Sequence, residues 1–83
     1  MDYHKGSIEV NTNPIKILAS ISSKQKTNKF VEFGIVREVL RNHHLLREEF
    51  MPLLNKLEEL GYVRILPYKG VALTAKGRRK VHL

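Results

Sequence analysis

The sequence predicts an α+β fold in which three helices come first and a β-hairpin follows them. Two observations carry this prediction. Before Gly61, apolar residues recur at helical spacing in three separate segments. After Gly61, apolar and polar residues alternate as they do in strands, in "YVRIL" and "VALT" on either side of the turn "PYKG". A chain of 83 residues has room for one such domain with a modest core.

The first helix is predicted to begin at Asn13 and Pro14. Asparagine is a good N-cap, and proline suits the first helical position because the N–H that it lacks would have no partner there. Residues 13–83 form the predicted domain. Residues 1–12 form an N-terminal arm, whose "SIEV" either adds an edge strand or stays outside the sheet. The apolar stripe of the first helix consists of Ile15, Leu18 and Ile21, with Ile17 and Ala19 beside them.

The second helix is predicted over residues 29–41, after the polar loop "SSKQKTN" in which Thr27 or Asn28 would be its N-cap. Gly34 in its middle costs about 1 kcal/mol of helix propensity relative to alanine. We therefore expect Gly34 to allow close packing against another helix. The apolar positions of this segment, at helical spacing, are Phe30, Phe33, Val36 and Leu40.

The third helix is predicted to begin at Glu48 or Glu49, after the turn "NHHLL". Pro52 sets this start, because proline is harmless in the first turn of a helix and costs about 3 kcal/mol in its interior. Gly61 is the predicted C-terminal stop. The predicted buried face is Phe50, Leu53, Leu54, Leu57 and Leu60, and the outward positions are Glu48, Pro52, Asn55 and Glu59, with Met51 and Lys56 on the flanks.

Thr74 is the predicted N-cap of a last short helix, "AKGRRKVHL", which follows the hairpin. The complete order is then helix, helix, turn, helix, hairpin and helix start. This is the order of a winged helix-turn-helix, a three-helix bundle with a C-terminal two-stranded β-wing. In such a fold the third helix lies in the major groove of DNA, and the hairpin lies on the phosphate backbone or enters the minor groove.

The charges of the chain are segregated. Lys and Arg number 15 and Asp and Glu number 8, which gives a net charge of +7. The acids lie mostly between Glu32 and Glu59, and none follows Glu59. A positive surface is typical of proteins that bind nucleic acid or an anionic membrane. The plainer interpretation is that a small basic protein uses such charge for solubility. The bases after Glu59 are Arg64, Lys69, Lys76, Arg78, Arg79 and Lys80.

The sequence also bears on location. No stretch approaches the ~20 apolar residues of a membrane span, and "MDYHKGSIEV" lacks the apolar core of a signal peptide. The expected location is therefore the cytoplasm, in association with the nucleoid. The chain has no cysteine, so neither a disulfide nor a thiolate site is expected.

The segment "FMPLLNKLEELGYV" followed by "KGVALTAKG" resembles the winged-helix regulators of the PadR family, with MarR- and DtxR-type repressors as near relatives. The resemblance covers roughly residues 29–83 and is strongest from residue 50 onward. It implies a winged-helix fold, double-stranded DNA as the partner, and transcription regulation, with repression expected. The positions that match the family pattern are Pro52, Leu53, Leu54, Lys56, Leu57, Glu58, Gly61, Leu73, Thr74 and Gly77.

The chain departs from the family pattern in two places. The family usually has small or polar residues at the start of the third helix, whereas this chain has Glu48 and Glu49. Such carboxylates can accept from cytosine amino groups, but they also repel phosphates. PadR-type proteins dimerise through long C-terminal helices, whereas this sequence stops at Leu83. A homodimer is therefore expected to form through the N-terminal third, by the first helix and the N-terminal strand.

Each residue that is predicted to contact DNA also has a plainer interpretation. Asn55 is the predicted base-reading residue, since asparagine can pair with adenine N6 and N7; the alternative is an exposed helical amide. In the wing, Lys69 lies at the tip and Arg64 on a strand, while Tyr68 either touches DNA or packs on the hairpin. Phosphate contacts, or else a solvated surface, are predicted for Arg37, Arg41, Arg47 and Lys56, and near the chain end for Arg78, Arg79 and Lys80.

His43 and His44 resemble metal ligands at first sight, because His44 and Glu48 are four residues apart. No further ligand lies at a recognisable spacing, and structural zinc normally has four. Both histidines are predicted to be turn residues that bind phosphate when protonated, and no metal or cofactor is expected. Neither a Gly-rich phosphate loop nor a Ser-His-Asp spacing is recognisable, so an enzyme is not expected.

The sequence thus predicts a sequence-specific double-stranded DNA-binding regulator that acts as a homodimer, with repression expected. Two alternatives stay open. A winged helix can serve as a protein-interaction module, which the acidic start of the third helix favours. An architectural chromatin protein would bind DNA without sequence preference, which the acid-free hairpin and tail would also serve.

Overall fold

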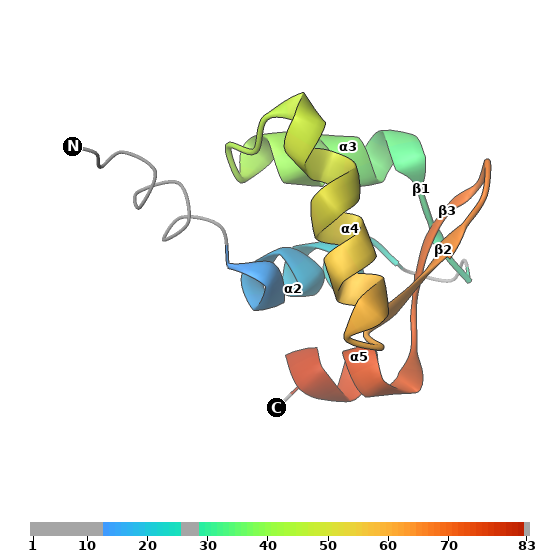
Figure 1. Cartoon of the computed structure of the whole chain (residues 1–83). Helices are drawn as coiled ribbons and strands as arrows, with labels where there is room; N and C mark the ends of the chain where they lie inside the picture. The colour runs from blue at the N-terminus through green and yellow to red at the C-terminus, as the bar shows by residue number, and fades with distance from the viewer. Residues whose placement is uncertain (1–12, 26–28, 83) are drawn as a thin grey trace.

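The structure is a computed structural model that describes residues 13–25 and 29–82 (Figure 1). Within these residues the chain is an α+β domain with a three-stranded antiparallel sheet. The α+β class is the one that the sequence predicts. Figure 1 shows the helices gathered together and a hairpin projecting beside them. The elements are α2 (Pro14–Lys24), β1 (Val31–Glu32), α3 (Phe33–Asn42), the 3-10 turn η1 (Arg47–Glu49), α4 (Phe50–Glu59), β2 (Val63–Leu66), β3 (Gly70–Leu73) and α5 (Ala75–Val81).

The sheet has one strand more than the predicted two-stranded wing. Its order is β1-β3-β2, and Val31 of β1 pairs with Val71 of β3. The predicted helix over residues 29–41 is therefore wrong at its start, because the helix begins at Phe33 with Glu32 as its N-cap. Val31 is β-branched and only 2% exposed, so pairing with β3 buries it better than a helical turn at the surface would. The predicted caps, Thr27 and Asn28, lie outside the described residues.

Side-chain caps fix the ends of two helices as predicted. The Asn13 Oδ1 accepts from the N–H groups of Ile15 and Lys16, at 3.0 and 3.3 Å. The Thr74 Oγ1 accepts from the Gly77 N–H at 3.0 Å and its hydroxyl donates to the Gly61 carbonyl at 2.6 Å. The start of α5 is thus tied directly to the end of α4.

The third helix begins at Phe50, one or two residues after the predicted start at Glu48 or Glu49. η1 ends at Glu49, and α4 then places Pro52 in its first turn, where a missing N–H is tolerated. The Glu49 Oε1 accepts from the Leu46 N–H at 2.7 Å and closes this turn. Leu60 is an exception to the predicted buried face, because it is 40% exposed. It is the C-cap of α4, and the chain turns away at Gly61, which has φ +84°.

The core lies where α2, α3 and α4 meet the sheet. Ile17, Leu18 and Ile21 of α2 are each 0% exposed. These side chains are therefore unavailable for the predicted homodimer contact through the first helix, and the predicted arm, residues 1–12, lies outside the described residues. The other buried apolar residues are Val31, Val36, Val39, Leu40, Leu45, Phe50, Leu53, Leu54, Leu57, Val63, Val71 and Leu73.

Gly70 and Gly34 offer a matched test of the third strand. A Cβ on Gly70 would overlap the Val31 carbonyl oxygen, whereas a Cβ on Gly34 would meet no atom within 4 Å. Gly34 therefore makes no close helix contact, contrary to expectation. Gly70→Ala should lower the free energy of unfolding by about 1–3 kcal/mol. Gly34→Ala should raise it by up to about 1 kcal/mol, because alanine is the better helix former. Denaturant titrations of both variants measure this, and a Gly70→Ala variant at least as stable as the wild type would contradict the β1–β3 pairing.

Candidate nucleic-acid interface

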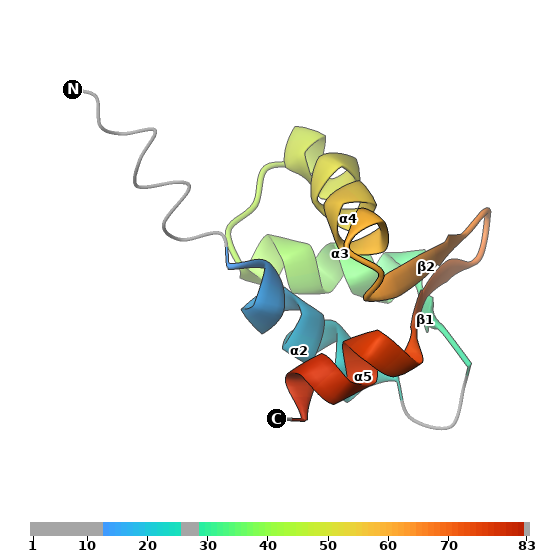
Figure 2. The same cartoon turned by 60° about the horizontal axis from the view of Figure 1, so that its bottom comes forward.

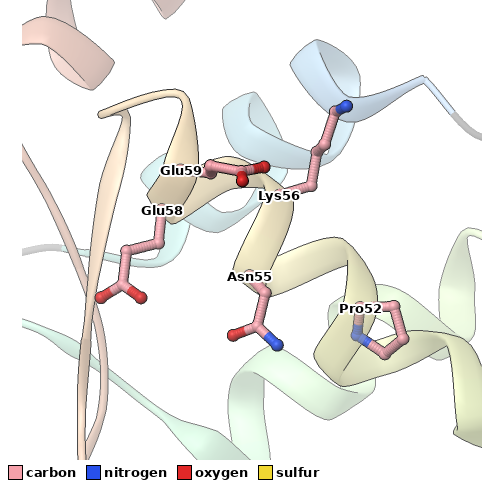
Figure 3. A pocket seen from close by; sticks show the side chains of 5 residues that line it. All are labelled: Pro52, Asn55, Lys56, Glu58 and Glu59. Atoms are coloured by element: carbon pink, nitrogen blue, oxygen red, sulfur yellow. The ribbon is translucent and has the colours of Figure 1, made fainter.

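The exposed face of α4 forms a shallow, open depression. Figure 3 shows Asn55 and Glu58 directed to one side of the helix and Lys56 to another. The carboxamide of Asn55 is exposed, which fits the predicted outward orientation of this residue. The residues that line the depression are Pro52, Asn55, Lys56, Glu58 and Glu59.

One acid of this face has a role in the fold. The Glu58 Oε2 accepts from the Ile65 N–H at 2.9 Å. Since β2 is an outer strand of the sheet, this hydrogen bond uses an edge N–H that the sheet itself leaves open. It also holds the hairpin against the C-terminal half of α4. Glu58 matched the family pattern, but its spacing gave no sign of this contact.

The charge on η1 and α4 is negative overall. This segment carries Glu48, Glu49, Glu58 and Glu59 against the bases Arg47 and Lys56. Phosphates would be repelled by such a surface if it stood alone. Attraction to a polyanion therefore has to come from the elements on either side of α4.

A hollow at the N-terminal end of α4 supplies one such element. We call it the arginine hollow: its lining is Arg37, Arg41, Leu45, Leu46, Arg47 and Phe50. Arg37 and Arg41 are one turn apart on α3, so they lie on the same face of that helix. Arg47 joins them from η1, and no acid is among these lining residues. Guanidinium groups in this arrangement can make charge-assisted, bidentate hydrogen bonds to phosphate oxygens.

The sequence predicts each of these arginines separately as a phosphate contact. It does not show that the turn after α3 brings Arg47 back to Arg37 and Arg41. Leu45 and Phe50 also line the hollow. In the sequence, their apolar side chains indicate only that they belong to the core. They are 7% and 8% exposed and form the apolar floor of the hollow.

The hairpin supplies the second basic element. Arg64 on β2 and Lys69 at the turn are both exposed, as predicted. Tyr68 does not pack on the hairpin, because it is 101% exposed and has φ +65°. The Lys69 N–H donates to the Leu66 carbonyl at 3.0 Å and closes the turn. Proline followed by a residue with positive φ is the pattern of a type II turn, in which glycine usually takes the place of Tyr68.

The two histidines that are predicted to bind phosphate have different surroundings. The His43 Nε2 lies 2.9 Å from the Ser20 Oγ, so this half-buried ring joins the end of α3 to α2 rather than facing the arginine hollow. His44 is exposed, has φ +66°, and donates its N–H to the Arg41 carbonyl at 2.9 Å where α3 ends. Over residues 13–25 and 29–82, no group of three His, Asp or Glu side chains is placed to hold a metal ion.

The predicted basic cluster near the chain end lies on α5, which packs against α2 (Figure 2). The Arg78 Nη1 donates to the Leu73 carbonyl at 3.2 Å and so ties α5 to β3. Lys76 is a contact that sequence reasoning missed: its Nζ donates to the Leu60 carbonyl at 3.0 Å and lies 5.4 Å from the centre of the Tyr62 ring. Arg79 and Lys80 remain exposed.

Comparisons of the chain with protein-family models, with curated proteins and with solved structures found no match. None of the helices in the described part of the chain has the length and apolar character that a membrane crossing requires.

Proposed function

We propose that the chain is a winged helix-turn-helix protein that binds double-stranded DNA and regulates transcription, as a repressor. The observation that carries the proposal is the setting of α4. Its exposed face presents Asn55, and basic groups stand at both of its ends: the arginine hollow at the start of the helix and the hairpin beside its C-terminal half. A helix held between two cationic elements is suited to enter a groove while its neighbours contact the phosphates on either side.

The arrangement of elements supports the winged-helix part of the proposal. α2, α3 and α4 are the three helices of the bundle, and β2 and β3 form the projecting wing. β1 extends the wing sheet on its inner side through β3. The added strand pairs with Gly70 and Val71, the part of β3 next to the turn, and leaves the side chains of Lys69 and Tyr68 exposed.

The proposed roles follow from the reach of each side chain. In the major groove, Asn55 would bond the N6 and N7 atoms of an adenine, and Glu48 would accept from a cytosine amino group. Backbone phosphates would be bound by the arginine hollow, by Lys56 and by the wing residues Arg64 and Lys69. Arg79 on α5 would add long-range attraction, while Arg78 is already engaged with Leu73. His44 is exposed at the end of α3 and could add a further contact.

A second candidate function is a protein-interaction module. The acids of η1 and α4 favour it, and so do Leu46 and Met51, which are 55% and 47% exposed. A homodimer is also part of our proposal. Since Ile17, Leu18 and Ile21 of α2 lie in the core, such a dimer would need other residues of the N-terminal third.

The proposal is tested by separating base contacts from backbone contacts. A preferred site is first selected from random duplex DNA, and affinities are then measured by fluorescence anisotropy on that site and on random duplex. Asn55→Ala should cost about 1–3 kcal/mol of binding free energy on the preferred site and little on random DNA. Lys69→Ala should weaken both about equally and reduce the salt slope by about one unit.

Circular dichroism of both variants provides the folding control. Both variants should stay folded, because the side chains of Asn55 and Lys69 are exposed. If neither substitution changes DNA affinity while the protein stays folded, α4 is not a recognition helix. The protein-interaction module would then be the better description. Equal losses on all sequences for Asn55→Ala would instead indicate the architectural, non-specific alternative.

A further inference from the structure

We propose that Tyr68 stacks on an unpaired base, so that the preferred ligand is duplex DNA that carries an unpaired base, as in a bulge, a gap or a fork. This inference rests on the proposed function and names its substrate more closely. Tyr68 is fully exposed at the tip of the β2–β3 hairpin. It lies in the turn between β2 and β3, at the end of the hairpin that projects beside the helices in Figure 1.

Two features of Tyr68 are unfavourable for the fold alone. An exposed fraction of 101% leaves the whole ring in water, and φ +65° places a side chain where glycine would fit without strain. Neither feature supports a contact within the domain. Backbone strain of this kind tends to persist at sites that bind a ligand, and large exposed aromatic rings are typical binding groups.

The backbone around Tyr68 is firmly held. The Lys69 N–H closes the turn on Leu66 at 3.0 Å, and the Lys69 carbonyl accepts from the Phe33 N–H at 3.2 Å. Gly70 packs so closely on Val31 that no Cβ would fit between them. Because the backbone of this turn is already held in place, it loses little conformational freedom when the Tyr68 ring binds a ligand, and this favours affinity.

The positive charge around the Tyr68 ring favours a polyanion as the ligand. No Asp or Glu occurs after Glu59, and Lys69 lies next to Tyr68 with Arg64 on the adjoining strand. An aromatic side chain between basic residues is the arrangement by which proteins hold single-stranded nucleic acid, with the bases stacked on the ring and the backbone near the cations. A protein partner would not require this excess of positive charge.

An unpaired base is favoured over a paired one on energetic grounds. To insert between paired bases, the ring would have to unstack a base step and kink the duplex. A single base–ring stack returns less than that opening requires, and an unpaired base avoids the opening altogether. The rest of the proposed interface still needs a duplex beside the unpaired base.

The test uses the full chain and three DNA probes of one sequence: a paired duplex, the same duplex with a single bulged 2-aminopurine, and the single strand. The wild-type protein should bind the bulged duplex about 5- to 150-fold more tightly than the paired one, which corresponds to about 1–3 kcal/mol for one stacked base. Stacking on the ring should also quench the 2-aminopurine fluorescence. Tyr68→Phe retains the ring and should keep both effects.

Tyr68→Gly is the sharpest variant, because it removes the ring and relieves the positive φ. Its thermal unfolding midpoint should be equal to or above that of the wild type, while both the preference for the bulge and the quenching disappear. Tyr68→Ala should lose the same preference. A bulge preference that survives in Tyr68→Gly, or a wild-type protein that binds both duplexes equally, overturns the inference. Paired-duplex binding that persists in those cases leaves the proposed function standing, whereas no binding to any probe removes both.

Discussion

Leu57→Ala is expected to lower the free energy of unfolding by about 2–5 kcal/mol. Leu57 is 0% exposed at the centre of the buried face of α4. Its truncation removes apolar contacts from the core and leaves a cavity that the surrounding side chains fill only in part. Denaturant unfolding monitored by circular dichroism measures the loss, since a domain of this size is expected to unfold in a two-state manner.

Leu60→Ala is the matched control, because it makes the same chemical change three residues later. Leu60 is 40% exposed and caps the helix, so its truncation should lower the free energy of unfolding by less than about 1 kcal/mol. If Leu60 proved the more costly position, α4 would be rotated about its axis. Asn55 would then no longer face solvent, and its proposed base contact would fail as well.

The sequence predicts those parts of the fold that local chemistry determines. Asn13 and Thr74 are caps whose side-chain oxygens accept from N–H groups two or three residues further along the chain. Pro52 likewise sets the start of α4 by a restriction within one helical turn. The buried face of α4 follows from helical spacing, up to the residue at which the helix ends.

The features that the sequence does not predict depend on contacts between distant residues. β1 has two residues, and its strand conformation comes from pairing with β3, about forty positions further along the chain. Before that pairing is known, Phe30, Phe33 and Val36 read as one helical stripe. The arginine hollow similarly needs the angle between α3 and η1. For Tyr68, only the conformation of the turn decides between packing and exposure.

The affinity for duplex DNA is expected to fall about 250- to 1,000-fold between 50 and 200 mM salt. If each protomer neutralises roughly four to six phosphates, the slope of log K against log salt is about −4 to −5 per protomer. Releasing condensed counterions from the DNA drives this part of the binding, so added salt opposes it. Fluorescence anisotropy titrations at several salt concentrations measure the slope, and a flat response would contradict DNA as the partner.

The same measurement of the salt slope shows which basic surface of the protein contacts the DNA phosphates. Changing Arg37, Arg41 and Arg47 together to glutamine should make the slope shallower by about two to three units, because each charge that contacts a phosphate contributes close to one. Arg79→Gln combined with Lys80→Gln removes charge from α5, which packs on α2 instead of flanking the exposed face of α4. That pair should change the slope by less than one unit. A large change from the α5 pair together with none from the arginine hollow would place the DNA on α5, and α4 would lose its proposed position in the major groove.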